Sequence, residues 1–336
     1  MNTKQLSYII SIAEHQSLSA ASVKLGVSQP ALSKYLSELE EELGTELFLR
    51  HKKRLYLTSA GKIYVDAARR IITVKNQTYQ TIAALSGQVQ RSLIVGVTPL
   101  RGAISIARIF TDFRRQFPDV NITFKEQYTA ELRQSVISRS VHMALGTCID
   151  LEDPELLQIS AHEEDLLLFV PSFHPLASLA SSDLEHPAAI DIRSFQDTPF
   201  LLCGKGSTLR KLNEEVFRQN QMNPTIIYES NNNLLLKNMV QNGAGTCLLP
   251  RSLAAPSRDI VYFSLKPNYY THLSVMVAKD RVLSEEERYL IALIFASQQS
   301  NPNYRFRPSP LAKEIIDEFT LPSSIGQEFP KYEFSF

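Results

Sequence analysis

The sequence has little of what covalent cross-links, metal sites and membrane spans require. Its three cysteines, Cys148, Cys203 and Cys247, are odd in number and far apart. This spacing excludes a disulfide framework and a Cys-x-x-Cys metal site. No apolar run approaches the length of a membrane-spanning helix, and the first residues lack the basic start and apolar run of a signal peptide. We therefore expect a cytoplasmic protein that does not associate with membranes.

Patterns typical of enzymes and cofactor sites are also missing. No Gly-x-Ser-x-Gly occurs, and none of the seven histidines is paired at His-x-x-x-His spacing. Residues 204–208 lack the Gly-x-x-x-x-Gly-Lys spacing of a phosphate-binding loop, and residues 243–245 lack the third glycine of a dinucleotide site. We expect no enzymatic activity, no metal and no cofactor.

Charge is unevenly distributed along the chain. The 336 residues carry no net charge, yet residues 1–90 hold 11 Lys and Arg against 7 Asp and Glu. Between Arg50 and Lys75 there are eight basic residues and one acid, Asp66. A basic block on a neutral chain is typical of a protein that binds a polyanion, although a solvated helix face has a similar composition. The length suggests two or three domains, and a hydrophobic content of 44% supports sizeable cores.

Residues 17–36 have the pattern of two short helices joined by a tight turn. We expect Ser19 to cap the first helix and Gly26 to end it, because glycine enters the left-handed region without a Cβ penalty. Ser28 can cap the second helix, with Pro30 in its first turn. Apolar residues at helical spacing face inward on this second helix, namely Leu32, Leu36 and Leu39.

The outer face of the second helix is polar and rich in hydrogen-bonding groups. It carries Gln29, Ser33, Lys34 and Ser37, which suit base edges in a DNA major groove. An ordinary helical hairpin with a solvated face is the alternative. Two apolar runs then flank a cationic turn at residues 51–54, which predicts a two-stranded wing whose basic side chains contact phosphates.

Residues 1–61 together resemble the winged helix-turn-helix of LysR-type transcriptional regulators. The residues that carry the resemblance are Ala20-Ala21, Val27-Ser28-Gln29-Pro30-Ala31-Leu32-Ser33, Leu39-Glu40, Leu43-Gly44, Leu47-Phe48, Arg50, Arg54 and Leu57-Thr58-Ser59-Ala60-Gly61. We therefore expect double-stranded DNA as a partner, and RNA polymerase as a further one. The predicted DNA-binding residues are Ser28, Gln29, Pro30, Ser33, Lys34, Ser37, Arg50, Lys52, Lys53, Arg54 and Thr58.

A long helix is predicted to follow the wing, at residues 59–88, with Thr58 as its cap. Apolar or small residues recur on it at alternating spacings of four and three, at Ile63, Ala67, Ile71, Val74, Thr78, Ile82 and Leu85. Such a seam needs a surface to cover it, and the same helix of a second subunit is the favoured one. The resemblance implies the same dimerisation helix, in a homodimer or homotetramer. Packing of the seam on the chain's own C-terminal domain is the alternative.

From residue 91 onwards strands alternate with helices, which predicts a largely parallel sheet covered by helices. The expected strands are residues 93–97, 120–124, 142–146, 166–170, 200–203, 226–228, 246–250 and 273–278. The expected helices are residues 100–117, 130–139, 209–219, 232–242 and 284–297. Residues 166–170 are expected to begin a new unit.

The resemblance to LysR-type regulators extends, more diffusely, to about residue 300. It rests on Val95-Gly96-Val97-Thr98-Pro99, Phe117-Pro118-Asp119-Val120, His174-Pro175-Leu176-Ala177, Gly243-Ala244-Gly245-Thr246 and Leu249-Pro250. It implies an α/β effector domain with the two-lobed fold of periplasmic binding proteins, with one lobe at 91–164 plus 270–300 and the other at 165–269. Residues 301–336 are longer than is usual in the family. A helix is expected at 311–319, and the aromatic residues Phe329, Tyr332, Phe334 and Phe336 suggest that the end packs on another surface, with a mobile tail as the alternative.

In such a fold a ligand binds at the carboxyl ends of strands, where helix N-termini point towards it. The predicted ligand-binding residues are Thr98, Leu100, Arg101, Thr129, Thr147, Gly204 and Ser207. Hydroxyl groups beside free backbone N–H groups favour an anion, so a small carboxylate is the expected effector. Simple helix capping explains the same serines and threonines, because caps need these residue types.

The sequence thus favours a DNA-binding regulator controlled by a small effector. Three alternatives remain open at this point. One is an architectural DNA-binding protein without a ligand, and another is an enzyme or solute-binding module. The third is a redox sensor that acts through Cys203, although the next cysteine along the chain, Cys247, is distant in sequence.

Overall fold

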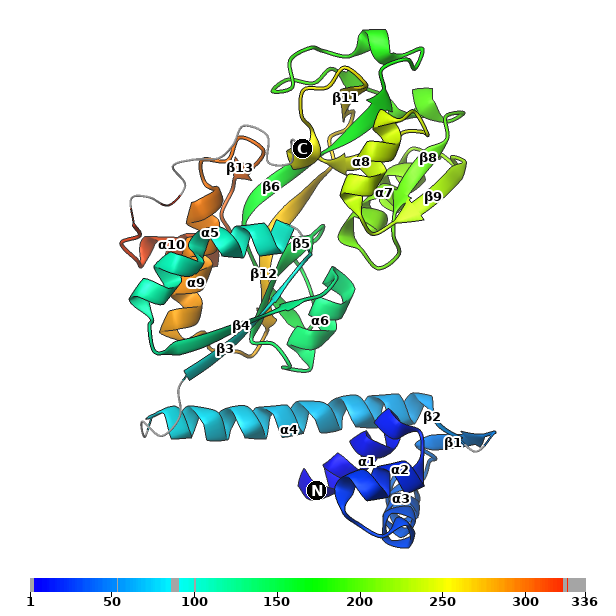
Figure 1. The fold of residues 1–336 in the computed structure, drawn as a ribbon, viewed down its shortest axis with the longest axis vertical. Coiled ribbons are helices and arrows are strands. Elements are labelled where there is room, and N and C mark those ends of the chain that lie inside the picture. The colour runs from blue at the N-terminus through cyan, green and yellow to red at the C-terminus, as the bar shows by residue number, and fades with distance from the viewer. Residues whose placement is uncertain (1–2, 53, 86–90, 100, 323–324, 326–336) are drawn as a thin grey trace. The chain divides into compact units, whose positions relative to one another are not determined.

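The computed structural model describes residues 3–52, 54–85, 91–99, 101–322 and 325 (Figure 1). The aromatic residues Phe329, Tyr332, Phe334 and Phe336 lie outside the described residues. The chain divides into two compact units, one of residues 1–91 with 137–140 and the other of residues 92–136 with 141–336. We refer to them as the N-terminal and C-terminal units. Within the described residues, no helix has both the length and the apolar character needed to cross a membrane.

The N-terminal unit consists of helices and one hairpin. Its elements are α1 (Thr3–His15), α2 (Leu18–Leu25), α3 (Gln29–Leu43), β1 (Phe48–His51), β2 (Arg54–Leu57) and α4 (Ser59–Leu85). The core joins the inner faces of all of them and includes Ile9, Ala21, Leu32, Leu47 and Val65. The expected helix pair, two-stranded wing and long helix are therefore present.

Helix ends in this unit follow from single residues. Gly26 adopts a left-handed conformation with φ 64° and ends α2, and Ser28 caps α3 by accepting a hydrogen bond from the Ala31 N–H at 3.3 Å. The prediction that Ser19 caps the first helix is wrong. Ser17, with extended backbone, is the cap, because the buried Leu18 is already the first helical residue and places Ser19 inside the helix.

The C-terminal unit is built on a mixed sheet with the strand order β4-β3-β5-β12-β6-β11-β7. Its strands are β3 (Arg91–Val97), β4 (Val120–Glu126), β5 (Met143–Cys148), β6 (Leu156–Pro171), β7 (Ala189–Ile190), β8 (Phe200–Cys203), β9 (Ile226–Ser230), β10 (Cys247–Pro250), β11 (Ile260–Leu265), β12 (Tyr270–Ala278) and β13 (Arg305–Phe306). Its helices are α5 (Arg101–Gln116), α6 (Thr129–Ile137), α7 (Thr208–Gln219), α8 (Asn233–Gln241), α9 (Glu285–Gln298) and α10 (Pro310–Asp317), with short 3₁₀ turns at Ala177–Leu179, Ile192–Phe195 and Arg251–Leu253.

The expectation of a largely parallel sheet is wrong for this unit. Strands β3 and β5 pair in parallel, as do β8 and β9, but β12 is antiparallel to both of its neighbours, β5 and β6. Strands β10 and β11 are also antiparallel to β6. The chain returns through β12 in the reverse direction, and the alternation of strands and helices along the sequence does not reveal that return.

Strand β6 is the element for which the predicted bounds differ most from the structure. Residues 166–170 are not a strand of their own, since they are the second part of a strand that starts at Leu156. Up to Asp165 this strand pairs with β12, and from Leu166 onwards it pairs with β10 and β11. A single strand therefore runs from one part of the sheet into the other.

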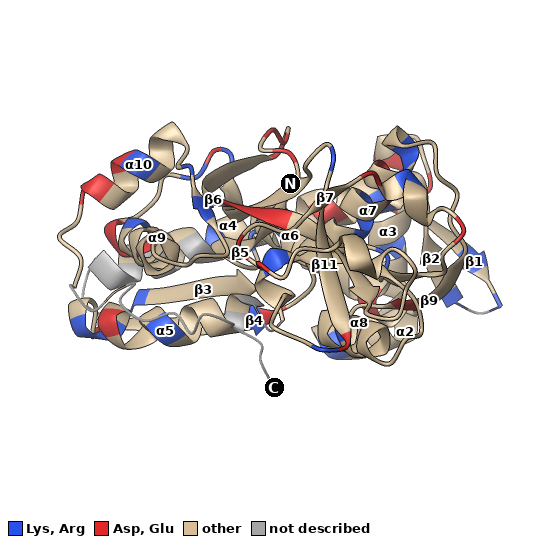
Figure 2. Ribbon diagram, turned by 90° about the horizontal axis from the view of Figure 1, so that it is seen from above, with Lys and Arg blue, Asp and Glu red and all other residues tan. Residues whose placement is uncertain are grey.

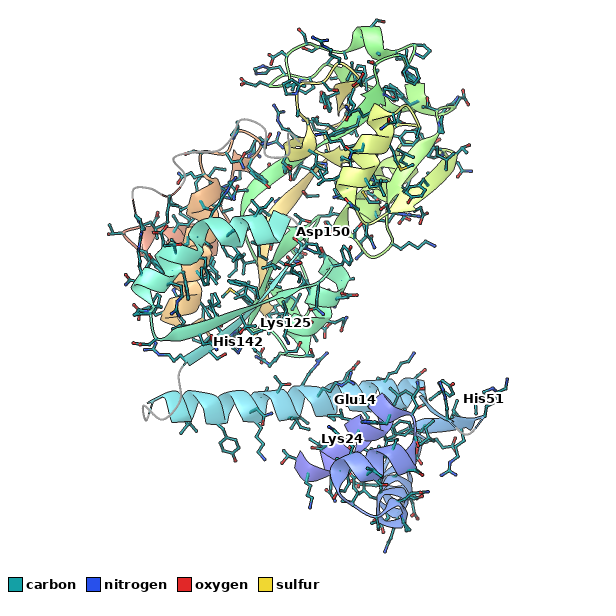
Figure 3. All side chains as sticks on the ribbon, in the orientation of Figure 1. Glu14, Lys24, His51, Lys125, His142 and Asp150 are labelled. Carbon is teal, nitrogen blue, oxygen red and sulfur yellow. The ribbon has the colours of Figure 1, made fainter. Side chains whose placement is uncertain are left out.

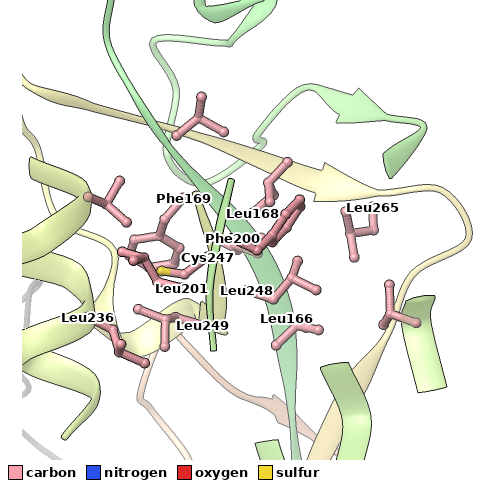
Figure 4. Close-up of a cluster of buried hydrophobic side chains, with 14 of the residues drawn as sticks. Leu166, Leu168, Phe169, Phe200, Leu201, Leu236, Cys247, Leu248, Leu249 and Leu265 are labelled. Carbon is pink, nitrogen blue, oxygen red and sulfur yellow. The ribbon is translucent and has the colours of Figure 1, made fainter. Parts of the chain in front are cut away.

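Two separate hydrophobic cores lie along this strand. We call the parts around them the first and the second lobe. The first core contains Val95, Phe113, Leu145, Val275 and Phe295, from β3, α5, β5, β12 and α9. The second is shown in Figure 4 and contains buried side chains of β6, β8, β10 and α8, such as Phe169, Phe200, Leu236 and Leu248.

Candidate DNA-binding surface and effector pocket

Helix α3 presents the predicted base-reading residues on one side. Gln29, Lys34 and Ser37 are exposed and Ser33 is half-buried, whereas Leu32 is fully buried on the other side. The hydroxyl of Ser19 on α2 donates to Gln29 Oε1 over 2.8 Å. This hydrogen bond leaves the amide nitrogen of Gln29 free to donate to a base edge. Pro30 is exposed in the first turn, and Ser28 is engaged as the cap.

The wing is held to α3 and α4 by polar contacts. Glu40 on α3 accepts hydrogen bonds from the backbone N–H groups of Leu47 and Phe48, at 2.7 and 3.1 Å. The Thr58 hydroxyl donates to the Glu46 carbonyl at 2.8 Å and accepts from the Gly61 N–H at 2.9 Å. Thr58 is thus the cap of α4, as predicted, and that role already uses its hydroxyl proton.

The tip of the wing is cationic and exposed. Arg50, His51, Lys52 and Arg54 all project from the β1–β2 hairpin into solvent, and Figure 2 shows the blue basic positions along it. Figure 3 labels His51 at this tip. Predicted residue Lys53 lies outside the described residues. Exposed guanidinium and ammonium groups on a short hairpin are suited to phosphate contacts, which position a protein on a duplex.

Helix α4 has one face in the core and another in solvent. Val65 and Ala68 are 2% and 1% exposed and pack in the N-terminal unit beside α1. The predicted seam, by contrast, is exposed along its described length, with Ile63 at 72% and Ile82 at 56%. Ala67, Ile71, Val74 and Thr78 are exposed as well, and the side chain of Leu85 lies outside the described residues. Within the described part of the N-terminal unit, the apolar stripe therefore lacks a cover.

A pocket of about 190 Å³ lies where the first lobe meets α7 of the second. Its wall includes the first turn of α6 with Thr129, the end of β5 with Thr147, and the start of α7 with Thr208. Thr208 Oγ1 donates to the Thr147 carbonyl over 2.8 Å, so a hydrogen bond joins the two lobes beside the pocket. Figure 3 labels Asp150, which follows β5 and also lines the pocket.

Charged groups of both signs line this pocket. Arg133 on α6 is bidentate to Asp153, with both distances 3.0 Å, and reaches Glu155 at 3.2 Å. Although burial raises it, the pKa of the Asp153 carboxyl is lowered overall because Arg133 stabilises its charged form. Lys211 and Asp150 are exposed at the pocket rim.

The structure brings together two of the predicted ligand residues, Thr129 and Thr147, in the pocket wall. Thr98 adjoins it, since a Cβ placed on Gly146 would lie 3.7 Å from Thr98 Cγ2 and 4.0 Å from Thr129 Oγ1. Gly204 and Ser207 lie beside the wall rather than in it, where Ser207 caps α7 by accepting from the Arg210 N–H at 3.1 Å. Leu100 lies outside the described residues, as does the side chain of Arg101.

Several residues that line the pocket were not predicted from the sequence, among them Arg133, Asp150, Gln158, Lys211 and Met276. Arg133 lies one helical turn after Thr129, so its position was available from the spacing. The others depend on how the lobes meet, and no local pattern marks them.

The three cysteines are buried and free. Burial raises the pKa of the Cys148 and Cys203 thiols to about 12 in each case. Burial likewise raises the pKa of Cys247, with a further contribution from the nearby Cys203. Reactive thiols need the thiolate form, so these environments suppress oxidation and metal binding. Among the described residues, no group of three or more His, Cys, Asp and Glu is placed to hold a metal ion.

Comparison with known proteins identifies the class to which these two sites belong. A family model described as "Bacterial regulatory helix-turn-helix protein, lysR family" matches residues 3–62. A second, "LysR substrate binding domain", matches residues 86–298. The chain therefore belongs to the LysR family and is a DNA-binding transcriptional regulator with an effector-binding domain, not an enzyme.

Individual relatives agree with this assignment. A "Probable RuBisCO transcriptional regulator" of Nostoc sp. (strain PCC 7120 / SAG 25.82 / UTEX 2576) is 30% identical over 325 residues, covering 95% of this chain and 88% of that protein. The "HTH-type transcriptional regulator XapR" of Escherichia coli (strain K12) is 25% identical over 291 residues, covering 86% and 96%.

Solved structures share the fold. Full-length BenM has a TM-score of 0.54 at 21% identity, with 92% of this chain and 100% of that one covered. Full-length CbnR in complex with its target DNA has a TM-score of 0.52 at 20% identity, with 84% and 94% covered.

Proposed function

We propose that this regulator works as a homo-oligomer, reads its operator with α3 and binds a small carboxylate in the pocket between its lobes. Gln29, Ser33 and Ser37 would read bases, and Arg50, Lys52 and Arg54 would contact phosphates. The lobes would be residues 91–164 with 270–300 and residues 165–269, a division supported by the change of pairing partner at Asp165. A ligand that prefers one lobe arrangement would shift the population of DNA-bound states and so affect RNA polymerase recruitment. We expect this activity in the cytoplasm.

The observation that carries the effector proposal is the pocket itself. The N-termini of α6 and α7 both reach its wall, and helix N-termini favour anions. Lys211 adds a positive charge at the rim. A volume of about 190 Å³ limits the ligand to a small metabolite. Because Asp150 and Glu152 also line the pocket, an acid that carries an amino group suits it better than a dianion.

The test is the thermal stability of the purified protein against matched acids, such as succinate and aspartate, together with aromatic acids. A ligand at about 100 times its dissociation constant stabilises the folded state by about 2.7 kcal/mol. This shift should vanish when Thr129 and Thr147 are both changed to Ala. The control, Ser181→Ala with Ser182→Ala, alters a separate groove of the second lobe and should respond like the wild type. No shift with any ligand would favour the architectural alternative.

The exposed stripe on α4 carries the oligomer proposal. A stripe of apolar side chains at heptad-like spacing finds its usual cover in a second copy of the same helix. Changing Ile71 and Val74 to Glu should produce a monomer in sedimentation velocity and weaken operator binding at least tenfold. The control is Asp66→Ala, an exposed position on the same helix outside the stripe. A variant with both glutamates that sediments like the wild type would refute the proposal.

The redox alternative has less support. The Cys203 thiol is 1% exposed, and burial keeps its pKa far above neutral pH. A sensor thiol is usually accessible and has a low pKa.

A further inference from the structure

The chain continues beyond the family match, which ends at residue 298. Residues 301–319 form an ordered segment, which we call the strap, and it contains β13 and α10. Figure 1 shows β13 beside β6 and α10 beside α9. Nothing in the DNA-binding surface or the pocket accounts for this segment.

The strap is bonded to both the sheet and a helix of the first lobe. Strand β13 pairs antiparallel with β6, with Arg305 opposite Glu163 and Phe306 opposite His162. Beyond it, the N–H groups of Arg307 and Ser309 donate to β6 carbonyls, each at 2.8 Å. Ala312 and Ile315 of α10 are fully buried in the first core. Arg288 on α9 adds ion pairs with Glu314 and Glu318.

The strap reaches β6 where the strand passes from one lobe to the other. Asp165 is the last β6 residue paired with β12. Its carboxylate lies 2.8 Å from Arg305 Nη2 of the strap and 4.0 Å from Arg251 Nη1 of the second lobe. Arg251 also donates to the carbonyls of Leu184 and Glu185, at 2.9 and 2.7 Å. One carboxylate thus links the strap and the second lobe at the crossover.

The strap also covers a histidine whose ring is held by apolar packing. His162 is fully buried, and neither of its ring nitrogens has a hydrogen-bond partner among the described residues. Its ring packs against Phe295 of α9 and against Tyr304 and Phe306 of the strap, with centroids 5.2 to 6.0 Å apart. Two of these three rings leave with the strap. Release of the strap would let water reach the imidazole, and this hydration would offset part of the free energy lost with the strap contacts.

Strand register connects the strap to the pocket. Arg305 is opposite Glu163, Glu163 is opposite His272, and His272 is opposite Cys148. Directly opposed residues on neighbouring strands share a face and are close enough to interact. This row therefore runs from the strap across β6 and β12 to Cys148, which lines the pocket.

We propose that the strap is a latch on the crossover strand. When docked, it holds the lobes in the arrangement in which Thr208 bonds to Thr147 and the pocket is formed. When released, it lets β6 bend and the lobes separate, so the pocket loses its shape and effector affinity falls. The part of this inference that concerns the effector rests on the proposed function, whereas the latch itself does not.

The test measures lobe motion in the full-length protein without any effector. Nitroxide labels at Asp119→Cys in the first lobe and Asp197→Cys in the second report the distance between the lobes. Both positions are exposed and all native cysteines are buried. Changing Arg305 and Phe306 to Ala should at least double the width of the distance distribution and raise amide exchange in residues 160–165 at least tenfold. The control is Lys313→Ala, at an exposed position of α10, which should match the wild type.

A second variant distinguishes release of the latch from misfolding of the strap. Asp165→Asn keeps the β13 pairing but removes the charge that Arg305 and Arg251 share, and it should broaden the distribution in the same direction. A distribution unchanged in both variants would overturn the latch.

An acid that stabilises the wild type should bind the Arg305→Ala, Phe306→Ala variant at least tenfold more weakly. Equal affinity would overturn the coupling to the pocket. If no acid binds the wild type, the proposed effector function fails, while the label distances still decide the latch.

Discussion

The stability of the protein at acidic pH is the sharpest test of how His162 is buried in the C-terminal unit. Burial alone lowers the pKa of this imidazole from 6.5 to about 4. The folded state therefore holds the neutral form while the unfolded chain takes up a proton below pH 6.5. This contribution to stability is fully present above pH 6.5 and is lost as the pH falls towards 4. With a pKa of 6.5 in the unfolded chain and about 4 in the folded state, the free energy of unfolding falls by about 2 kcal/mol from pH 7.5 to pH 5.0.

His142 makes a comparable contribution. Burial, with Arg281 nearby, lowers its pKa to about 4, and its Nδ1 accepts the Ile94 N–H at 3.0 Å. His142 and His162 together contribute a loss of about 4 kcal/mol between pH 7.5 and 5.0. His162→Leu should reduce the loss that the wild type shows by about 2 kcal/mol. At pH 7.5 the free energy of unfolding of this variant should fall by at most about 1 kcal/mol relative to the wild type. The reason is that an apolar group replaces ring nitrogens that have no hydrogen-bond partner.

Urea unfolding followed by circular dichroism at both pH values measures these differences. His186→Leu, at an exposed position of the second lobe, is the control and should keep the wild-type difference. If His162→Leu also keeps it, the imidazole is either hydrated or hydrogen-bonded in the folded state. The account of its desolvation by the strap would then be refuted.

Three further outcomes are expected. Arg54→Ala should weaken binding to specific and random duplexes alike and reduce the slope of log K against log salt by about 1. Gln29→Ala should lower the discrimination between specific and random duplexes about tenfold and leave that slope unchanged. Fluorescence anisotropy measures both effects. Gly61→Ala should destabilise the N-terminal unit by roughly 2 kcal/mol or more in thermal unfolding, because the new Cβ would lie 2.0 Å from the Leu47 carbonyl oxygen. Cys203 should resist thiol reagents until the protein unfolds, since burial raises its pKa to about 12.

The DNA-binding half of the molecule was largely predictable because its signals are local. Gly26, Ser28 and Pro30 fix helix ends within a few residues, and the structure places them as expected. The error at Ser19 has the same local origin. Two serines flank Leu18, and only the burial of that leucine decides which of them precedes the helix.

The effector half was predictable in most of its elements but not in their pairing, and strands β7, β11 and β13 were not expected. Most strand and helix positions follow from apolar periodicity, but the direction of β12 and the length of β6 depend on partners distant in sequence. The pocket shows the same limit. Thr129 and Thr147 lie at the ends of predicted elements and were among the predicted ligand residues, whereas Lys211 lines the pocket only because α7 of the second lobe lies beside the first lobe.

The strengths of the contacts suggest where control of the lobes resides. The Thr208–Thr147 contact beside the pocket is a single neutral hydrogen bond, which contributes about 1 kcal/mol. The strap, by contrast, combines strand pairing, a shared carboxylate and buried apolar side chains on the crossover strand itself. In the proposed mechanism, a ligand with a few good contacts outweighs the first, whereas the second sets the stiffness against which the ligand acts. Sequence changes in the strap should therefore tune the effector response without altering any residue that contacts the effector or the DNA.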